Sequence, residues 1–152
     1  MSVLFEDNSI RVKEALNEAI IAYLHEAAGE VEAQSKRNTR VDQSNLKNSW
    51  SHIVNEGKKE ATIGSPLENA IWEEFGTGEY ALKGDGRKGG WYIPEEKLSA
   101  KAKSKMQRRE IKGKVYYFTR GKTPSRAFQK AYESSKPKII KRAQQVIGGK
   151  MK

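Results

Sequence analysis

The sequence has no cysteine, only two histidines and no long run of apolar residues. The absence of cysteine excludes disulfide frameworks, thiol nucleophiles and cysteine-based zinc sites. No apolar stretch is long enough to cross a membrane, and the amino terminus is neither basic nor apolar enough for a signal peptide, so we expect neither a membrane span nor export. Hydrophobic residues make up 36% of the chain, which is low for a free-standing globular domain. Part of the stability is therefore expected to come from surface buried in an assembly.

The charge of the chain is large and unevenly distributed. Lys and Arg number 29 against 19 Asp and Glu, which gives a net charge of +10 over 152 residues, a length typical of one domain. Residues 1–32 carry a net charge of −5, residues 33–100 a net charge of 0, and residues 101–152 a net charge of +15. A molecule polarised in this way can stack head-to-tail on copies of itself or lay one face on nucleic acid.

Helices are predicted near both ends of the chain. Over residues 9–37 apolar side chains recur at spacings of three and four, which is typical of an amphipathic helix packed on other elements. Its apolar stripe comprises Val12, Leu16, Ala19, Ile20, Tyr23, Ala27 and Val31. A similar period follows Pro124, where Pro137 either kinks one long helix or separates two, with an end at residues 148–149.

The middle of the chain predicts a small, mainly antiparallel sheet. A hairpin is expected from residues 49–55 and 60–64, followed by a two-turn helix over residues 67–75. The aromatic and β-branched segments 91–93 and 115–118 are expected to pair with each other. The predicted fold class is therefore α+β, in which a long amino-terminal helix and a carboxyl-terminal helix pack on a small sheet with long loops.

Two segments are expected to be mobile loops within a single domain of residues 1–152. Six of the 13 glycines fall within residues 76–90. Residues 101–114 hold seven bases and one acid, with too few apolar side chains to fold alone. We interpret this second segment as a basic insertion between two strands. Its basic residues are Lys101, Lys103, Lys105, Arg108, Arg109, Lys112 and Lys114.

No set of residues indicates catalysis or cofactor binding. His25 and Glu26 begin like a zinc-protease motif, but Gly29 stands where the second histidine belongs. Residues 84–89 match a dinucleotide-binding pattern without its flanking strand and helix, and residues 121–123 resemble the end of a phosphate-binding loop that lacks its first glycine. Both histidines are expected to be structural or on the surface. We therefore expect no enzymatic activity, no cofactor and no bound metal.

Three short motif segments lie along the chain in one order. They are V-D-Q-S-N-L-K-N-S at residues 41–49, A-I-W-E-E-F-G-T-G at residues 70–78 and G-K-T-P-S-R-A-F at residues 121–128. The set resembles the gene-product-ten-like head-tail joining, or tail-completion, proteins of long-tailed bacteriophages. That family usually has Gly where Ser44 stands and Phe where Ser125 stands. The most specific motif is E-F-G-T, at residues 74–77.

The resemblance implies a single head-tail joining domain that forms a ring, most often a hexamer, in the neck of the phage. The implied partners are further copies of the chain, the head-connector or stopper protein, and the tail-terminator or tail-tube proteins, with no membrane. The implied location is the virion, after assembly in the cytoplasm of the host bacterium. The motif residues that carry a structural role are Asp42, Leu46, Ser49, Ala70, Glu74, Phe75, Gly76, Thr77, Pro124 and Phe128.

The E-F-G-T motif is typical of a scaffold. We expect Phe75 to end a short helix and bury its ring, Gly76 to adopt the left-handed conformation that stops a helix, and Thr77 to hydrogen-bond nearby backbone. Glu74 either lies in solvent or faces the core, where it needs an ion-pair partner such as Arg126 or an arginine of a neighbouring subunit.

The basic segment and the aromatic strands leave alternatives open. Residues 101–114 have three alternative interpretations: a solvated loop, a contact with the acidic helix of a neighbouring subunit, or a contact with DNA in the neck channel. The leading hypothesis is a structural protein that joins the head-connector complex to the tail as a ring. The alternative is a basic nucleic-acid-binding protein of one domain, in which aromatic side chains on paired strands stack on single-stranded bases. If this alternative is wrong, the same side chains belong to the core. They are Trp91, Tyr92, Tyr116, Tyr117 and Phe118. A DNA-binding regulator is disfavoured because no helix-turn-helix spacing is evident.

Overall fold

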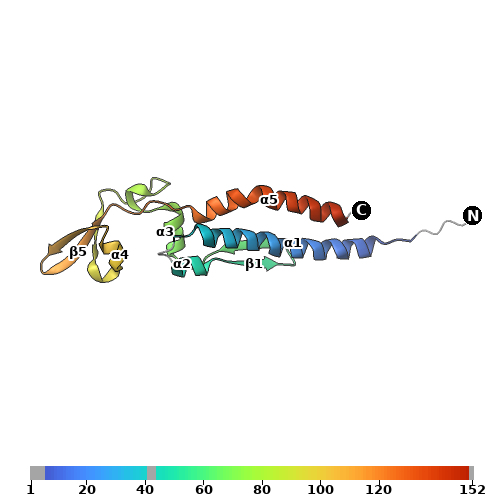
Figure 1. The fold of residues 1–152 in the computed structure, drawn as a ribbon, viewed down its shortest axis with the longest axis horizontal. Coiled ribbons are helices and arrows are strands. Elements are labelled where there is room, and N and C mark those ends of the chain that lie inside the picture. The colour runs from blue at the N-terminus through green and yellow to red at the C-terminus, as the bar shows by residue number, and fades with distance from the viewer. Residues whose placement is uncertain (1–5, 41–43, 151–152) are drawn as a thin grey trace, which may run out of the picture. The chain divides into compact units, whose positions relative to one another are not determined.

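The computed structural model describes residues 6–40 and 44–150 of the chain (Figure 1). These residues form two compact units: unit 1 contains the described parts of Met1–Leu67 and Ala127–Lys152, and unit 2 contains Glu68–Arg126. Helices and antiparallel strands occur in both units, which confirms the α+β class. The strands form two separate sheets, a two-stranded one in unit 1 and a three-stranded one in unit 2. The expectation of a single joining domain over residues 1–152 stays a prediction.

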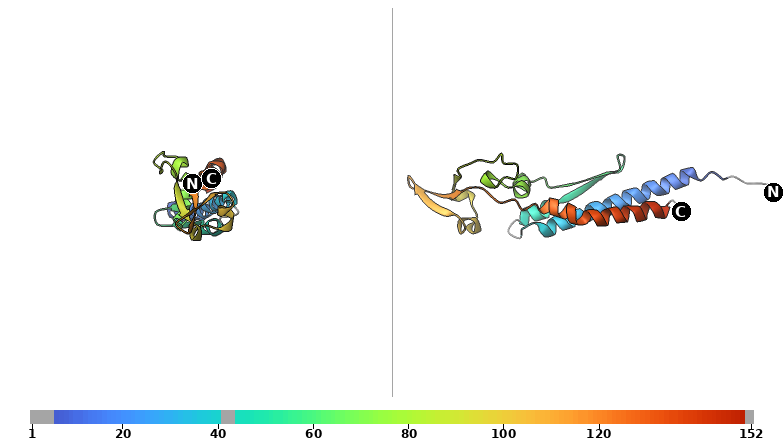
Figure 2. Two further views of the ribbon diagram at one scale, coloured as in Figure 1. Left: turned by 90° about the vertical axis from the view of Figure 1, so that its left-hand side faces the viewer. Right: turned by 90° about the horizontal axis from the view of Figure 1, so that it is seen from above.

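Unit 1 is organised around one long helix. Helix α1 (Ser9–Asn38) contacts helix α5 (Ala127–Lys150) and also the hairpin of strands β1 (Ser51–Asn55) and β2 (Glu60–Gly64). A short helix, α2 (Ser44–Ser49), precedes β1. Helices α1 and α5 run side by side in opposite directions (Figures 1 and 2). The predicted amino-terminal helix and the predicted hairpin are therefore confirmed.

Small side chains line the contact between α1 and α5. The buried positions are Ala28, Val31 and Ser35 on α1 and Ala127, Ala131 and Ser135 on α5. Successive members are three or four residues apart, so each set lies on one face of its helix, and small side chains allow the two backbones to approach closely. The predicted apolar stripe is buried only in its later part, because Val12 is 50% exposed.

Trp50 closes the end of this helix pair. Its ring stacks on Phe128 of α5, with 5.6 Å between ring centroids and 15° between planes, and its Nε1 donates to Thr39 Oγ1 at 2.9 Å. Leu46 of α2 is also buried in unit 1, at only 1% exposed. A tryptophan with its N–H satisfied contributes a large apolar area without the cost of an unpaired polar group. Trp50 therefore anchors unit 1, a role that the sequence alone did not indicate.

Helix α5 settles the choice left open at Pro137. The helix runs without interruption from Ala127 to Lys150, with Pro137 inside it, so the segment is one helix rather than two. Its end was expected at residues 148–149, and the structure carries it through both glycines. Proline removes one backbone donor, a loss that one long helix can tolerate when its face is packed on a neighbour.

Unit 2 contains the aromatic strands. Strand β3 (Trp91–Pro94) pairs antiparallel with β5 (Lys114–Thr119), which confirms the predicted pairing, and β5 also pairs with β4 (Gln107–Ile111). Helix α3 (Asn69–Phe75) and three short elements complete the unit: η1 (Gly78–Tyr80), η2 (Glu95–Lys97) and α4 (Ala100–Lys103).

The expectation that residues 101–114 form a loop is wrong. The segment contains part of α4 and the whole of β4, a strand whose five side chains are all exposed. Ser99 caps α4 by accepting from Ala102 N, and β4 turns into β5 at Lys112 and Gly113, both of which have positive φ. Such a two-residue turn matches the twist of a hairpin. Main-chain pairing with β5, rather than apolar burial, therefore holds this basic segment, which is why its composition predicted a loop.

Candidate functional surfaces

Two of the motif segments meet in unit 2. Thr77 N donates to the Lys122 carbonyl at 2.9 Å, and Lys122 N donates back to Thr77 Oγ1 at 2.9 Å. Ser125 N donates to the Glu73 carbonyl at 2.7 Å, and Glu79 N to the Arg120 carbonyl at 2.9 Å. We call this contact between residues 73–79 and 120–125 the motif junction. The expectation that Thr77 bonds nearby backbone is confirmed.

Two glycines make the motif junction sterically feasible. Gly76 has φ +75°, as expected of the residue that stops helix α3, and a Cβ there would lie 2.8 Å from the Tyr80 carbonyl oxygen and 2.9 Å from that of Lys122. Gly121 has φ +122°, and a Cβ on it would overlap the carbonyl oxygen of Thr77. Only glycine combines this backbone conformation with so close an approach.

Glu73 is the buried carboxylate of the motif, and Glu74 is not. Glu73 is 5% exposed and forms an ion pair with Lys122, whereas Glu74 is half-buried. The predicted pairing of Glu74 with Arg126 stays a prediction. The expected burial of Phe75 is wrong: its ring is 42% exposed, with the Lys83 ammonium 5.5 Å from its centroid. Helix α3 is rotated relative to the expectation, so that it buries Ala70 and Glu73 on one face.

The remaining motif residues lie in both units. Ala70 is buried in α3, and Pro124 lies at the motif junction, 2.9 Å from the position of a Cβ on Gly76. In unit 1, Leu46 is buried and Ser49 Oγ donates to its carbonyl at 2.7 Å, while Phe128 stacks on Trp50. Asp42 lies outside the described residues. Apart from Glu74 and Phe75, the motif residues that the structure describes therefore support the backbone or the core of their unit.

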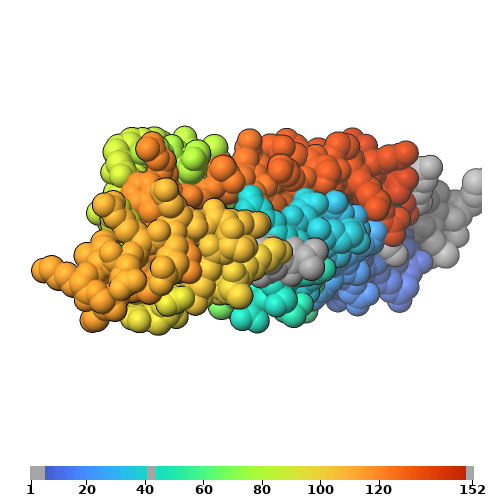
Figure 3. All heavy atoms as spheres, turned by 60° about the vertical axis from the view of Figure 1, so that its left-hand side comes forward, coloured from blue at the N-terminus to red at the C-terminus, as the bar shows by residue number. Residues whose placement is uncertain are grey.

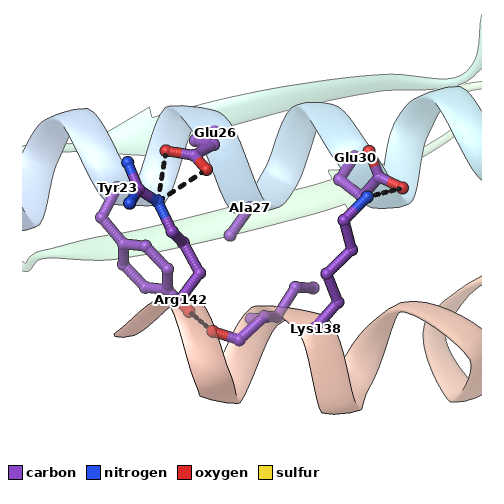
Figure 4. Close-up of a pocket in the computed structure, with 7 residues that line it drawn as sticks. Tyr23, Glu26, Ala27, Glu30, Lys138 and Arg142 are labelled. Atoms are coloured by element: carbon purple, nitrogen blue, oxygen red, sulfur yellow. Dashed lines mark hydrogen bonds and ion pairs between the residues drawn. The ribbon is translucent and has the colours of Figure 1, made fainter. Parts of the chain in front are cut away.

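Charged side chains join the middle of helix α1 to the middle of helix α5 (Figure 4). Arg142 Nε donates to Glu26 Oε1 at 3.0 Å, and Lys138 Nζ lies 3.4 Å from Glu30 Oε1. Tyr23 Oη donates to the Ile139 carbonyl at 2.8 Å, and burial together with the Glu26 carboxylate raises the pKa of its hydroxyl. The hollow between these side chains, about 110 Å³, is too small for an ordinary cofactor. Part of the charge complementarity that we expected between subunits is thus satisfied within one chain.

A third polar cluster joins α1 to the hairpin. Glu32 Oε1 accepts from Lys36 Nζ at 2.5 Å, and His52 Nδ1 lies 2.5 Å from Glu32 Oε2. These two hydrogen bonds lower the pKa of Glu32 below its ordinary value of 4.5, and the bond from Lys36 has the larger effect. The rings of His25 and His52 are 6.0 Å apart, edge to face. Among residues 6–40 and 44–150, no group of three or more His, Asp or Glu side chains could hold a metal ion.

The three-stranded sheet of unit 2 carries a groove lined by bases and rings. Two adjoining hollows, of about 240 and 500 Å³, share Gln107 and Phe118. We call them together the basic groove; its other lining residues are Tyr80, Tyr92, Lys105, Met106, Arg108, Arg109, Thr119, Arg120 and Gly121. None of these residues is acidic. Residues 100–118, which include most of this sheet, form the yellow and orange surface in Figure 3.

Three of the seven predicted basic contact residues line this groove: Lys105, Arg108 and Arg109. Two of the others have different surroundings, since Lys103 pairs with Glu95 at 3.4 Å and Lys112 lies in the β4–β5 turn. Lys114 begins β5 and Lys101 lies in α4. The aromatic strand residues are divided between the two faces of the sheet. Tyr117 is buried on one face, whereas the register places Tyr92, Phe118 and Gln107 in one row on the other.

The amino-terminal part of the chain matches a known protein family. Residues 5–76, just under half of the chain, match the model of a family described as "Bacteriophage HK97-gp10, putative tail-component". The match includes the first motif segment and ends inside the second. No curated protein and no solved structure matches the chain. Within the part of the chain that the structure describes, no helix is long and apolar enough to span a membrane.

Proposed function

We propose that the protein joins head to tail as a ring in the phage neck, because residues 5–76 match the model of the bacteriophage HK97-gp10-like tail-component family. The resemblance drawn from the motif segments is confirmed by this match. The family gives the chain a structural role in a phage tail and a place in the virion, and it is not an enzyme family. The family match is the observation that carries the proposal.

The way the motif residues are used supports a scaffold. Gly76, Gly121 and Thr77 hold two distant segments together through main-chain contacts, and Phe128 packs in the core of unit 1. None of these residues presents a nucleophile with a neighbouring base, the arrangement that catalysis requires. A ring also offers a place to bury apolar side chains, since Ile53 on β1 is 73% exposed and Ile71 on α3 is 61% exposed.

The proposed assembly is a ring of six copies between the head-connector or stopper protein and the tail-terminator or tail-tube protein. It forms in the host cytoplasm and stays in the virion neck. Residues 76–90, which contain only the short element η1, become ordered against the next ring, so that interface burial offsets the entropy lost by the loop. The structured segment of α4 and β4 needs no such ordering.

Mass photometry of the purified protein, alone and mixed with the connector and tail-tube proteins of the same gene cluster, tests the ring. We expect particles of about six times the 17.2 kDa chain mass, alone or when a partner is added. A stop codon in the gene should give DNA-filled heads and separate tails in electron micrographs. A protein that stays monomeric with every partner, or a mutant phage that makes joined particles, would overturn the proposal.

A further inference from the structure

The basic groove differs from the other charged surfaces because its cations have no acidic neighbours in its lining. Lys105 makes no ion pair with any carboxylate of the described residues, and Arg109 Nη1 donates to the hydroxyl of Tyr92 at 2.7 Å. Two other groove cations do lie near an acid: Arg120 Nη1 is 3.4 Å from Glu79 Oε2, and Arg108 Nη2 is 4.0 Å from Glu110 Oε2. A guanidinium that bonds to a neutral hydroxyl keeps its full charge, so the groove has a positive potential.

Tyr92 positions the guanidinium of Arg109. The ring of Tyr92 lies 5.3 Å from that of Phe118, and the guanidinium carbon of Arg109 lies 5.9 Å from the Tyr92 centroid. One N–H of Arg109 is used by the Tyr92 hydroxyl, which leaves the others for a ligand. The rings therefore support the cation. Their contacts with each other and with Arg109 make them poor platforms for stacked bases.

Strand β4 adds a second source of donors. It is the edge strand of its sheet, since among the described strands it pairs only with β5. All five of its side chains are exposed, among them Gln107, Arg108 and Arg109. Edge N–H groups, amides and guanidinium groups all donate to phosphate oxygens without reading sequence.

We propose that the basic groove binds the sugar-phosphate backbone of double-stranded DNA, with Lys105 and Arg109 as phosphate contacts and Tyr92 as the positioning residue for Arg109. An acidic helix of a second copy is a poorer occupant. The carboxylates of Glu26, Glu30 and Glu32 already have cationic partners in their own chain. DNA, in contrast, carries an unpaired negative charge at every phosphate. The inference needs only unit 2 and does not depend on ring formation.

Fluorescence anisotropy with a labelled mixed-sequence duplex of about 20 base pairs tests the groove, between about 50 and 200 mM salt. The groove variant is Lys105→Gln with Arg109→Gln. The matched control is Lys88→Gln with Lys97→Gln, two exposed lysines of unit 2 outside the groove. Both variants remove two positive charges. We expect the slope of log affinity against log salt to fall by about 2 in the groove variant and by less than about 1 in the control.

Tyr92→Phe separates positioning from charge. It keeps the ring and the net charge but removes the hydroxyl that holds Arg109, so we expect about a threefold loss of affinity with an unchanged salt slope. Circular dichroism establishes that each variant is folded, and mass photometry follows ring assembly separately.

Three outcomes would overturn the proposal. Equal losses in the groove variant and the control would show that only net charge matters. Tighter binding of a single strand of the same length would replace backbone recognition by base stacking. A groove variant that binds duplex normally but no longer self-associates would assign the groove to a second copy of the chain.

Discussion

The charged side chains of helix α1 in unit 1 and those of the basic groove in unit 2 differ in their partners. In unit 1, acids on α1 are paired with bases on α5 and with the hairpin, as in Glu26–Arg142, Glu30–Lys138 and Glu32–His52. In unit 2, the groove residues Lys105 and Arg109 face no carboxylate among the lining side chains. The net charge of +10 therefore does not describe a uniformly basic surface. Glu26, Glu30 and Glu32 of helix α1 are paired inside unit 1, whereas the lining of the basic groove in unit 2 contains no acid.

The two units also differ in what holds them together. Unit 1 has a side-chain core, in which Trp50 stacks on Phe128 and Leu46 is fully buried. Unit 2 depends on main-chain contacts at the motif junction, where Gly76 and Gly121 allow two segments to approach closely. Side-chain truncation should therefore damage unit 1 most, and the addition of a Cβ should damage unit 2 most.

Trp50→Ala should have the largest effect on stability. It removes a 6% exposed ring that stacks on Phe128, and loss of a buried tryptophan costs about 3–5 kcal/mol. Urea unfolding followed by circular dichroism measures the change. Trp72→Ala in unit 2 is the matched control, because that ring is 49% exposed and should cost less than about 1 kcal/mol. Equal costs for the two substitutions would show that the contrast in packing is wrong.

Gly121→Ala should come next, at about 3 kcal/mol, because the new Cβ overlaps the Thr77 carbonyl in a backbone conformation that alanine avoids. Gly84→Ala separates the two causes. Gly84 also has positive φ, at +70°, but has open space around it, so its substitution should cost only about 1 kcal/mol. Limited proteolysis should show cleavage within unit 2 of the Gly121 variant. If Gly84→Ala were as damaging, strain alone would explain the result.

The sequence predicted the elements that have a clear period or composition. The helix over residues 9–37, the hairpin and the pairing of residues 91–93 with 115–118 all follow from side-chain patterns that local physics explains. Strand β4 was missed because its stability lies in backbone pairing and in the Lys112–Gly113 turn, neither of which composition records.

The candidate surfaces were less accessible to sequence. Residues 101–114 were recognised as a basic segment, but only strand register shows that Arg109 meets Tyr92, 17 residues away. The sequence also could not show which acid of helix α3 is buried: it is Glu73, whereas Glu74 is half-buried. Both are possible on a two-turn helix, and the choice depends on Lys122, a partner that lies far along the chain. The E-F-G-T motif gave the turn at Gly76 correctly because a glycine's backbone freedom is local.

The smallest predicted effect compares the units through pH. Lys36 and His52 lower the pKa of Glu32 in the folded state, so its hydrogen bonds with these side chains stabilise unit 1 at pH values above the unfolded pKa of 4.5, and this contribution is lost as pH falls through the lower folded pKa. Glu32→Gln should therefore reduce stability at pH 7, by about 1 kcal/mol or less for so small a set of charges, and should approach wild type in acid.

Urea midpoints measured between pH 7 and pH 3 check this expectation, with Glu18→Gln, on an exposed position of the same helix, as the control at all pH values. A gap between wild type and Glu32→Gln that widened in acid would contradict it. Glu32 is not a lining residue of the basic groove, so Glu32→Gln should leave DNA binding by the folded protein unchanged.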